Sequence, residues 1–225
     1  MVKETGAQGR NGHSRGNTGQ STVRLTDDHI RGGVWAHPWR SMANEEQWIK
    51  LLEAVRGPLP EAYIAMGELV STNKNVRWNP VEIPKGKPYV RVPIFNSDLG
   101  EISVIYFGGP VVTMPHRWPG ARVFYALLDG DLNQRSWGRV DNVARATGER
   151  RVTAPDLLFA PRGETYSFSS PEGAVCIVVH SEPRTGLEID DPTIGRTLTV
   201  EDGGEVLWPI EPDAIVNEST WSSES

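Results

Sequence analysis

The sequence predicts an all-β fold, a barrel or a sandwich built from short strands. From residue 89 onward, short runs rich in Val, Ile, Tyr and Phe follow one another closely, and turns rich in Gly, Pro or Asn separate them. Many short strands at this spacing are typical of β-barrels and β-sandwiches. With 225 residues, the chain is long enough for one such domain and its tails.

The N-terminal part predicts a tail followed by a helical extension. Residues 1–30 are rich in Gly, Ser, Asn and Gln and can bury little apolar surface, which predicts a disordered tail. Residues 31–60 predict an extension that is first aromatic and then helical. We expect its helix over residues 44–56, because Asn44 is a suitable N-cap and Trp48, Leu52 and Val55 recur at helical spacing. Gly57 and Pro58 then end the helix.

Residues 61–215 are assigned to the β domain and residues 216–225 to a disordered C-terminal tail. Asp129-Gly130 is expected to form the turn of a hairpin. Residues 195–200 and 206–210 are expected to add an edge strand. The strands expected before them cover residues 89–95, 101–107, 111–114, 122–128, 132–137, 151–153, 156–159, 165–168 and 174–181.

Charge and composition exclude several classes of function. The formal net charge of -6 argues against nucleic acid and anionic membranes as partners, because both require a basic surface. No apolar run is as long as a membrane span, and no apolar segment near the N-terminus suggests a signal peptide, so we expect a cytoplasmic protein. The single cysteine, Cys176, lies in an apolar strand and is expected to be a buried structural thiol.

Two local patterns resemble the two sequence motifs of the cupin superfamily. In the first, His116 stands in a turn before a strand that runs to Gly130. The second is Pro161-Arg162-Gly163-Glu164-Thr165-Tyr166, which is similar to Pro-x-Gly-x-x-His with Tyr166 at the His position. The resemblance implies a cupin double-stranded β-helix, or jelly-roll, barrel behind the short helical extension.

Within this superfamily, residues 85–185 most resemble the cysteine-dioxygenase-like branch. Tyr89-Val90-Arg91 is similar to a Tyr-x-Arg strand whose Arg binds a substrate carboxylate. His116 and Trp118 fall on the two positions of the family's His-x-His, and His180 falls on the position of a catalytic Tyr. Arg122 stands where cupins often carry a metal-binding Glu.

The same resemblance implies a degenerate metal site. The family's iron needs three His, and here Trp118 and Tyr166 occupy two of the ligand positions. We therefore expect no cofactor, or an unknown one, with Fe(II) as the alternative. Any metal would depend on His116 and His180, with Tyr166 and, from the N-terminal segment, His37 as further donors.

Several residues keep two interpretations. Arg91 lies among apolar and aromatic neighbours and needs a partner, which is either a bound carboxylate or an internal Asp or Glu. His116 and His180 are either functional groups in the barrel or structural histidines. Tyr89, Trp118 and Tyr125 are either walls of a ligand pocket or packing residues of the core.

The leading functional hypothesis is a cupin-fold enzyme that acts on a small carboxylate-bearing molecule, amino-acid-like or aromatic, by acid–base chemistry. The alternatives are a thiol-type non-haem iron dioxygenase with altered ligands and a non-catalytic ligand-binding cupin. Cupins often form dimers, so a homodimer is a further expectation. The aromatic residues 34–39 either belong to its interface or cap the barrel of their own chain. The expected catalytic residues are His116, His180 and Tyr166, and the expected substrate-binding residues are Arg91, Tyr89, Trp118 and Tyr125.

Overall fold

The structure is a computed structural model and describes residues 44–73, 83, 89–140, 143–184, 186–192, 195–200 and 215–221. Two helices come first, α2 (Glu45–Arg56) and α3 (Leu59–Asn73), and the secondary structure that follows them is antiparallel β-sheet. The prediction of an all-β domain behind a short helical extension is confirmed. The expected tail at residues 1–30 and the expected strand at residues 206–210 lie outside the described residues.

Helix α2 begins at a reciprocal cap. The backbone N–H of Gln47 donates to the side chain of Asn44 at 3.0 Å, and the backbone N–H of Asn44 donates to the side chain of Gln47 at 2.8 Å. This capping box satisfies two backbone donors that have no partner inside the helix. The helix ends at Gly57, as the sequence predicts.

Helix α3 extends the helical region beyond residue 60, the boundary expected from the sequence. Pro60 lies in the first turn of α3, where helix N–H groups lack partners and a proline is tolerated. Ala62, Met66 and Val70 then recur every four residues and are buried. The Gly-Pro pair therefore ends one helix and leads into the next. Neither described helix is long and apolar enough to cross a membrane.

The strands form two antiparallel sheets. The order in the first is β1 (Tyr89–Ser97), β2 (Gly100–Gly108), β9 (Gly173–His180), the first half of β5 (Val123–Val140) and β7 (Asp156–Ala160). The second contains β3 (Val111–Val112) and β4 (His116–Arg117), then β8 (Thr165–Ser170), the second half of β5 and β6 (Val143–Thr153). From β4 it continues through β10 (Leu187–Asp191), β11 (Arg196–Val200) and β12 (Ile215–Thr220).

The strand order is that of a jelly roll. When the segments from β2 to β9 are numbered along the chain, with β3 and β4 taken as one strand and β5 as two, the first sheet reads 1-8-3-6 and the second reads 2-7-4-5. Apart from segments 4 and 5, which form a hairpin, neighbours in each sheet are thus distant in sequence, as in the double-stranded β-helix. The predicted fold is confirmed.

Strand β5 connects the two sheets without a turn. Residues up to Gly130 pair with β9, and residues from Asp131 onward pair with β6, so the predicted hairpin at Asp129-Gly130 is wrong. Gly130 has a φ of 78°, and a Cβ atom there would lie 2.2 Å from the carbonyl oxygen of Gly173. A β-bulge between Leu127 and Asp129 adds to the bend. The glycine marks a bend between sheets because only glycine fits there.

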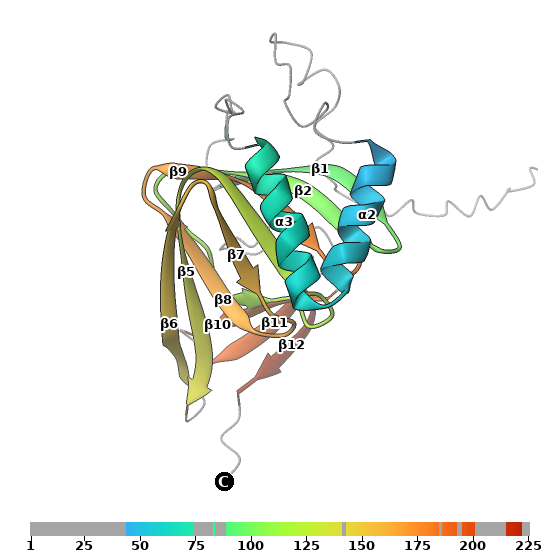
Figure 1. Ribbon diagram of the computed structural model, residues 1–225. Coiled ribbons are helices and arrows are strands. Elements are labelled where there is room, and N and C mark those ends of the chain that lie inside the picture. The colour runs from blue at the N-terminus through green and yellow to red at the C-terminus, as the bar shows by residue number, and fades with distance from the viewer. Residues whose placement is uncertain are drawn as a thin grey trace, which may run out of the picture. The chain divides into compact units, whose positions relative to one another are not determined.

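The helices cover the outer face of the first sheet (Figure 1). Helix α2 packs against β2 and β9, and α3 packs against β5 and β7. The ring of Tyr63 lies edge-on to Phe124 and Phe159, with 5.9 Å between ring centroids in each pair. Because this face is covered, both faces of β9 and of the first half of β5 are largely buried, and the interior between the two sheets is left for the aromatic core.

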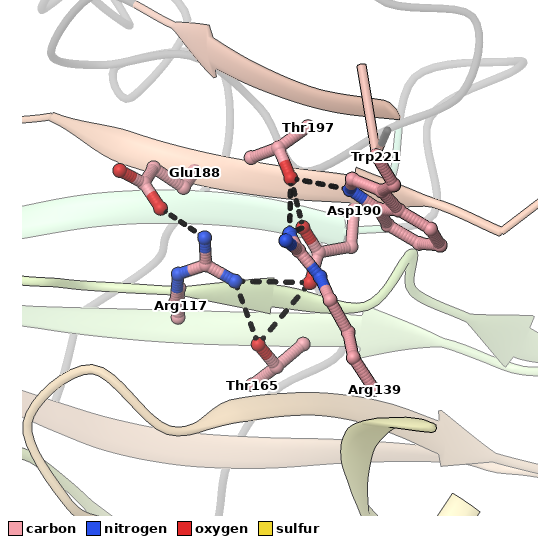
Figure 2. Close-up of polar contacts among 7 residues, drawn as sticks. All are labelled: Arg117, Arg139, Thr165, Glu188, Asp190, Thr197 and Trp221. Atoms are coloured by element: carbon pink, nitrogen blue, oxygen red, sulfur yellow. Dashed lines mark hydrogen bonds and ion pairs between the residues drawn. The ribbon is translucent and has the colours of Figure 1, made fainter. Parts of the chain in front are cut away.

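A polar network fastens the C-terminal strands to the second sheet (Figure 2). The buried carboxylate of Asp190 accepts hydrogen bonds from Arg117 and Arg139 at 3.0 Å each, and from the hydroxyls of Thr165 and Thr197 at 3.3 and 2.6 Å. The indole N–H of Trp221 donates to Thr197 at 2.9 Å. The prediction of a disordered tail from residue 216 is wrong for residues 216–220, which belong to β12 (Ile215–Thr220).

Candidate functional site

A small cavity lies inside the barrel, between the two sheets. Except for Tyr166, every residue that the sequence analysis selects for the site lines this cavity. The strands β1, β2, β4, β5, β8 and β9 contribute, together with the segments that follow β3, β4 and β9. The lining residues are Tyr89, Arg91, Ile105, Phe107, Thr113, His116, Trp118, Tyr125, Phe168, Val178, His180 and Arg184.

His116 occupies β4 and has a fixed tautomer. Its Nδ1 atom lies 2.8 Å from the carbonyl oxygen of Met114, and a carbonyl only accepts, so Nδ1 carries the proton. Nε2 then holds the lone pair and is the nitrogen able to take a proton. Burial lowers the pKa of His116 to about 4, the Met114 bond opposes this shift, and nearby Arg184 adds to it. At neutral pH the ring is an uncharged potential base.

His180 is the last residue of β9 and lies opposite Glu101 of β2 and Val123 of β5. Its ring stands edge-on to Trp118, with 5.1 Å between the ring centroids. Burial, followed by the charges of Arg184 and Arg91, lowers the pKa of His180 well below its usual value. Its buried Nδ1 atom has no hydrogen-bond partner among the described residues.

Arg91 is held by a carboxylate of its own chain. Its guanidinium pairs with Glu101, which lies on the adjacent strand β2. Of the two partners that the sequence leaves open for Arg91, the structure shows the internal one. The Nε atom of Arg91 is nevertheless buried and has no hydrogen-bond partner among the described residues. Arg91 therefore still presents a buried donor at the cavity.

Arg184 is a lining residue that sequence reasoning missed. Its guanidinium lies 3.7 Å from the carboxylate of Glu101 and sits over the ring of Trp118, 4.7 Å from the centroid. A charged residue in the turn after an apolar strand is normally solvated, yet Arg184 is only 6% exposed. No local pattern marks Arg184, because its partners Glu101 and Trp118 come from distant parts of the chain.

The tyrosine hydroxyls of Tyr125 and Tyr166 form a buried pair. Their oxygens are 3.0 Å apart, and burial raises the pKa of both phenols. Tyr166 packs edge-on against His116, with 4.6 Å between ring centroids, but it does not line the cavity. Tyr166 thus lies behind the cavity wall, in contact with His116 and Tyr125.

Two further residues lie away from the cavity lining. The guanidinium of Arg122 donates to the backbone carbonyls of Arg56 and Gly57 at 2.5 and 3.0 Å. It anchors the C-terminal end of α2 and does not take the place of a metal ligand. Cys176 is fully buried in β9, and burial raises the pKa of its thiol, so the prediction of a structural cysteine agrees with its surroundings.

The described residues do not fit a three-ligand metal centre. They contain no group of three His, Cys, Asp or Glu side chains placed to hold one ion. His116 and His180 share the cavity with the cationic Arg91 and Arg184, and the phenol of Tyr166 keeps its proton. His37, the remaining donor considered, lies outside the described residues. We assign no step to Fe(II).

No protein-family model matches the chain, and no curated protein matches it significantly. Similar solved structures include a double-stranded β-helix protein of Klebsiella pneumoniae (13% identity, 49% of this chain and 90% of that one, TM-score 0.41). Another is the DMSP lyase DddQ of Ruegeria pomeroyi (17% identity, 59% of this chain and 66% of that one, TM-score 0.41). A third is the cupin domain of Schizosaccharomyces pombe Cnp3 (13% identity, 43% of this chain and 66% of that one, TM-score 0.36). The chain thus spans about two thirds of the length of each of the last two proteins.

The order of the strands, and not these scores, identifies the architecture. The fold is the cupin-type double-stranded β-helix. At such low sequence identity, a shared fold transfers no residue roles and no chemistry from one protein to another. Any function must therefore be argued from the cavity itself.

Proposed function

We propose that this cupin-fold protein binds a small carboxylate-bearing molecule in its barrel cavity and transfers protons on it with His116 and His180. One observation carries the proposal. Two buried polar atoms, Arg91 Nε and His180 Nδ1, belong to residues that line the same cavity, and neither has a hydrogen-bond partner among the described residues. A buried polar group without a partner costs about 1–3 kcal/mol, so such groups call for a ligand or water.

A carboxylate suits this wall of the cavity. Its oxygens accept hydrogen bonds only, whereas the Nε–H of Arg91 is a donor and neutral His180 carries one N–H. Arg184 lies at the same end, over Trp118 and close to Glu101. Charge-assisted hydrogen bonds from guanidinium groups are among the strongest that a protein offers to a carboxylate. Tyr89, Trp118 and Tyr125 supply apolar walls around them.

The bound anion also prepares His116 for proton transfer. Arg184 contributes to the low pKa of His116 and to that of His180. A carboxylate beside Arg184 offsets this charge, and the pKa of both imidazoles then rises toward the neutral range where a general base is most effective. The reaction class is proton removal or return at a carbon next to the carboxylate, as in an isomerisation or elimination.

Solvent exchange tests the chemistry, and binding is measured beside it. Small 2-hydroxy acids are incubated with the protein in D₂O, and loss of the signal of the C2 proton, next to the carboxylate, is followed by NMR. We expect the protein to accelerate exchange for at least one acid. His116→Gln should abolish the acceleration and leave binding of that acid within about threefold, because removing one base affects proton transfer more than binding.

A matched pair of arginine variants tests the binding. Arg184→Met should weaken carboxylate binding at least tenfold, whereas Arg122→Met removes a guanidinium that contacts only α2 and should leave binding unchanged. Binding without any exchange would show a ligand-binding protein that is not an acid–base enzyme. Absence of binding to every carboxylate would overturn the proposal as a whole.

A further inference from the structure

We infer that the cavity selects carboxylates whose neighbouring carbon, C2, bears an uncharged group, such as the hydroxyl of a 2-hydroxy acid, over 2-amino acids. This inference rests on the proposed function and names the substrate class of the same site. It narrows the expectation from the sequence, which includes amino-acid-like molecules. The balance of charges around the cavity carries it.

The described wall of the cavity carries positive charge and no negative charge. Its charged side chains are Arg91 and Arg184, and none of its residues is an Asp or a Glu. The nearby carboxylate of Glu101 is outside the lining and serves both cations, since it pairs with Arg91 and lies 3.7 Å from Arg184. Two guanidiniums, which stay protonated, and one carboxylate leave a single positive charge. One bound carboxylate balances that charge.

The two histidines of the cavity respond to this positive charge. Burial is the largest cause of the low pKa of both rings, and the charge of Arg184 lowers the pKa of both further. The charge of Arg91 adds to the effect at His180. Because His116 lies on β4 and His180 on β9, the positive potential reaches both sheets. The neutral rings offer a ligand lone pairs and N–H groups but no negative charge.

An ammonium group at C2 is therefore disfavoured. A carboxylate that binds Arg91 and Arg184 brings its own C2 substituent close to both guanidiniums, and like charges a few ångströms apart repel each other in a partly buried site. Burial of a cation without an opposite charge is costly as well. A hydroxyl at C2 has nearly the same size, carries no charge and can donate to a neutral imidazole.

This selection does not depend on the length of the ligand. The wall residues Arg91 and Ile105 are only partly buried, so the tail of a longer ligand can extend past them toward solvent. The substituent at C2 cannot follow, because it is fixed next to the carboxylate. Its charge therefore affects binding in the same direction for short and for long ligands.

Pairs of ligands with matched shape measure the selection. Glycolate and glycine, lactate and alanine, and 3-phenyllactate and phenylalanine each differ by a hydroxyl in place of an ammonium. Dissociation constants for the wild-type protein at pH 7 are obtained from NMR chemical shifts. We expect each hydroxy acid that binds to do so at least tenfold more tightly than its amino acid, because the charge at C2 differs in the same way in every pair.

Two variants with the same substitution provide the control. Ile105→Asp adds a carboxylate to the cavity wall, opposite Arg91 in the pairing of β1 with β2, and should reduce the preference for hydroxy acids about threefold or more. Ile64→Asp adds the same charge on the exposed surface of α3 and should leave the preference as in the wild type. If Ile105→Asp does not fold or no longer binds these acids, the wild-type pairs alone decide.

The outcomes separate this inference from the proposed function. Amino acids that bind as tightly as their hydroxy acids would overturn the selection and leave carboxylate binding intact. A preference that is unchanged in Ile105→Asp would contradict charge as its cause. No binding of any of these acids to the wild type would overturn the selection together with the proposed function.

Discussion

Two histidines inside the barrel are uncharged at neutral pH, and the surroundings of each ring explain why. Both rings are removed from solvent, and both feel the positive charge of Arg184. The hydrogen bond from His116 to the carbonyl of Met114 fixes which nitrogen can accept a proton. At His180 one nitrogen remains without a partner in the described chain. These features make the pair sensitive to any anion that enters the cavity.

The stability of the fold should decrease as the pH falls below 6.5. Above this pH, the histidines are neutral in both folded and unfolded chains. Below it, the unfolded chain binds protons, whereas folded His116 stays neutral until its pKa of about 4, and the pKa of folded His180 also lies well below its usual value. Each buried histidine then removes about 1.4 kcal/mol of unfolding free energy per pH unit.

Urea unfolding at pH 7, 6 and 5 measures this loss. Acidic residues contribute equally to the wild type and to His116→Gln, so the difference between their slopes isolates one histidine. The variant should lose about 1.4 kcal/mol less per pH unit between pH 6 and pH 5. Equal slopes in the two proteins would show that His116 is protonated as easily in the folded chain as in the unfolded one.

At the scale of elements, the sequence predicted the strands better than their connections. Alternating Val, Ile and aromatic residues placed β1, β2, β8 and β9 close to their observed bounds, because period-2 alternation is a local signal. The sequence also predicted α2, because an N-cap residue and apolar residues at helical spacing are local signals too. It could not distinguish a hairpin from a bend at Gly130, because the neighbour that forces a glycine there, Gly173, comes from another part of the chain.

The bend in β5 should depend on Gly130. Gly130→Ala places a Cβ atom 2.2 Å from the Gly173 carbonyl oxygen at a φ of 78°, so a loss of about 2 kcal/mol or more is expected. Gly148→Ala is the control, since a Cβ atom on this β6 residue meets nothing within 4 Å, and a change below about 0.5 kcal/mol is expected. Chemical denaturation compares the two variants, and equal stability would contradict a special role for Gly130.

At the scale of the whole molecule, the candidate site is built from contacts that no local pattern reveals. The sequence selected Tyr89, Arg91, His116, Trp118, Tyr125 and His180, and the fold gathers all of them around one cavity. It did not indicate that Glu101 engages both Arg91 and Arg184, because each of these pairs forms only when separate strands and turns meet. It also selected Tyr166, which packs against His116 and is not among the residues that line the cavity.

On the outer face of the second sheet, too, contacts between distant parts of the chain decide the structure. Asp190 and its partners link β4, β5, β8, β10 and β11, and Trp221 joins them from the chain after β12 (Figure 2). The polar composition of the last residues suggested a frayed tail. Instead, β12 pairs with β11, and the indole of Trp221 donates to Thr197 and stacks 4.5 Å from the guanidinium of Arg139.

The most direct measurement follows the imidazole signals of His116 and His180 by NMR while acetate is added at pH 7, with His116→Gln and His180→Gln used to assign them. Both signals should shift saturably toward the protonated form in the wild type and in Arg122→Met, and neither should shift in Arg184→Met. Imidazole signals that ignore acetate in the wild type, or that respond equally in Arg184→Met, would contradict a carboxylate site in the barrel.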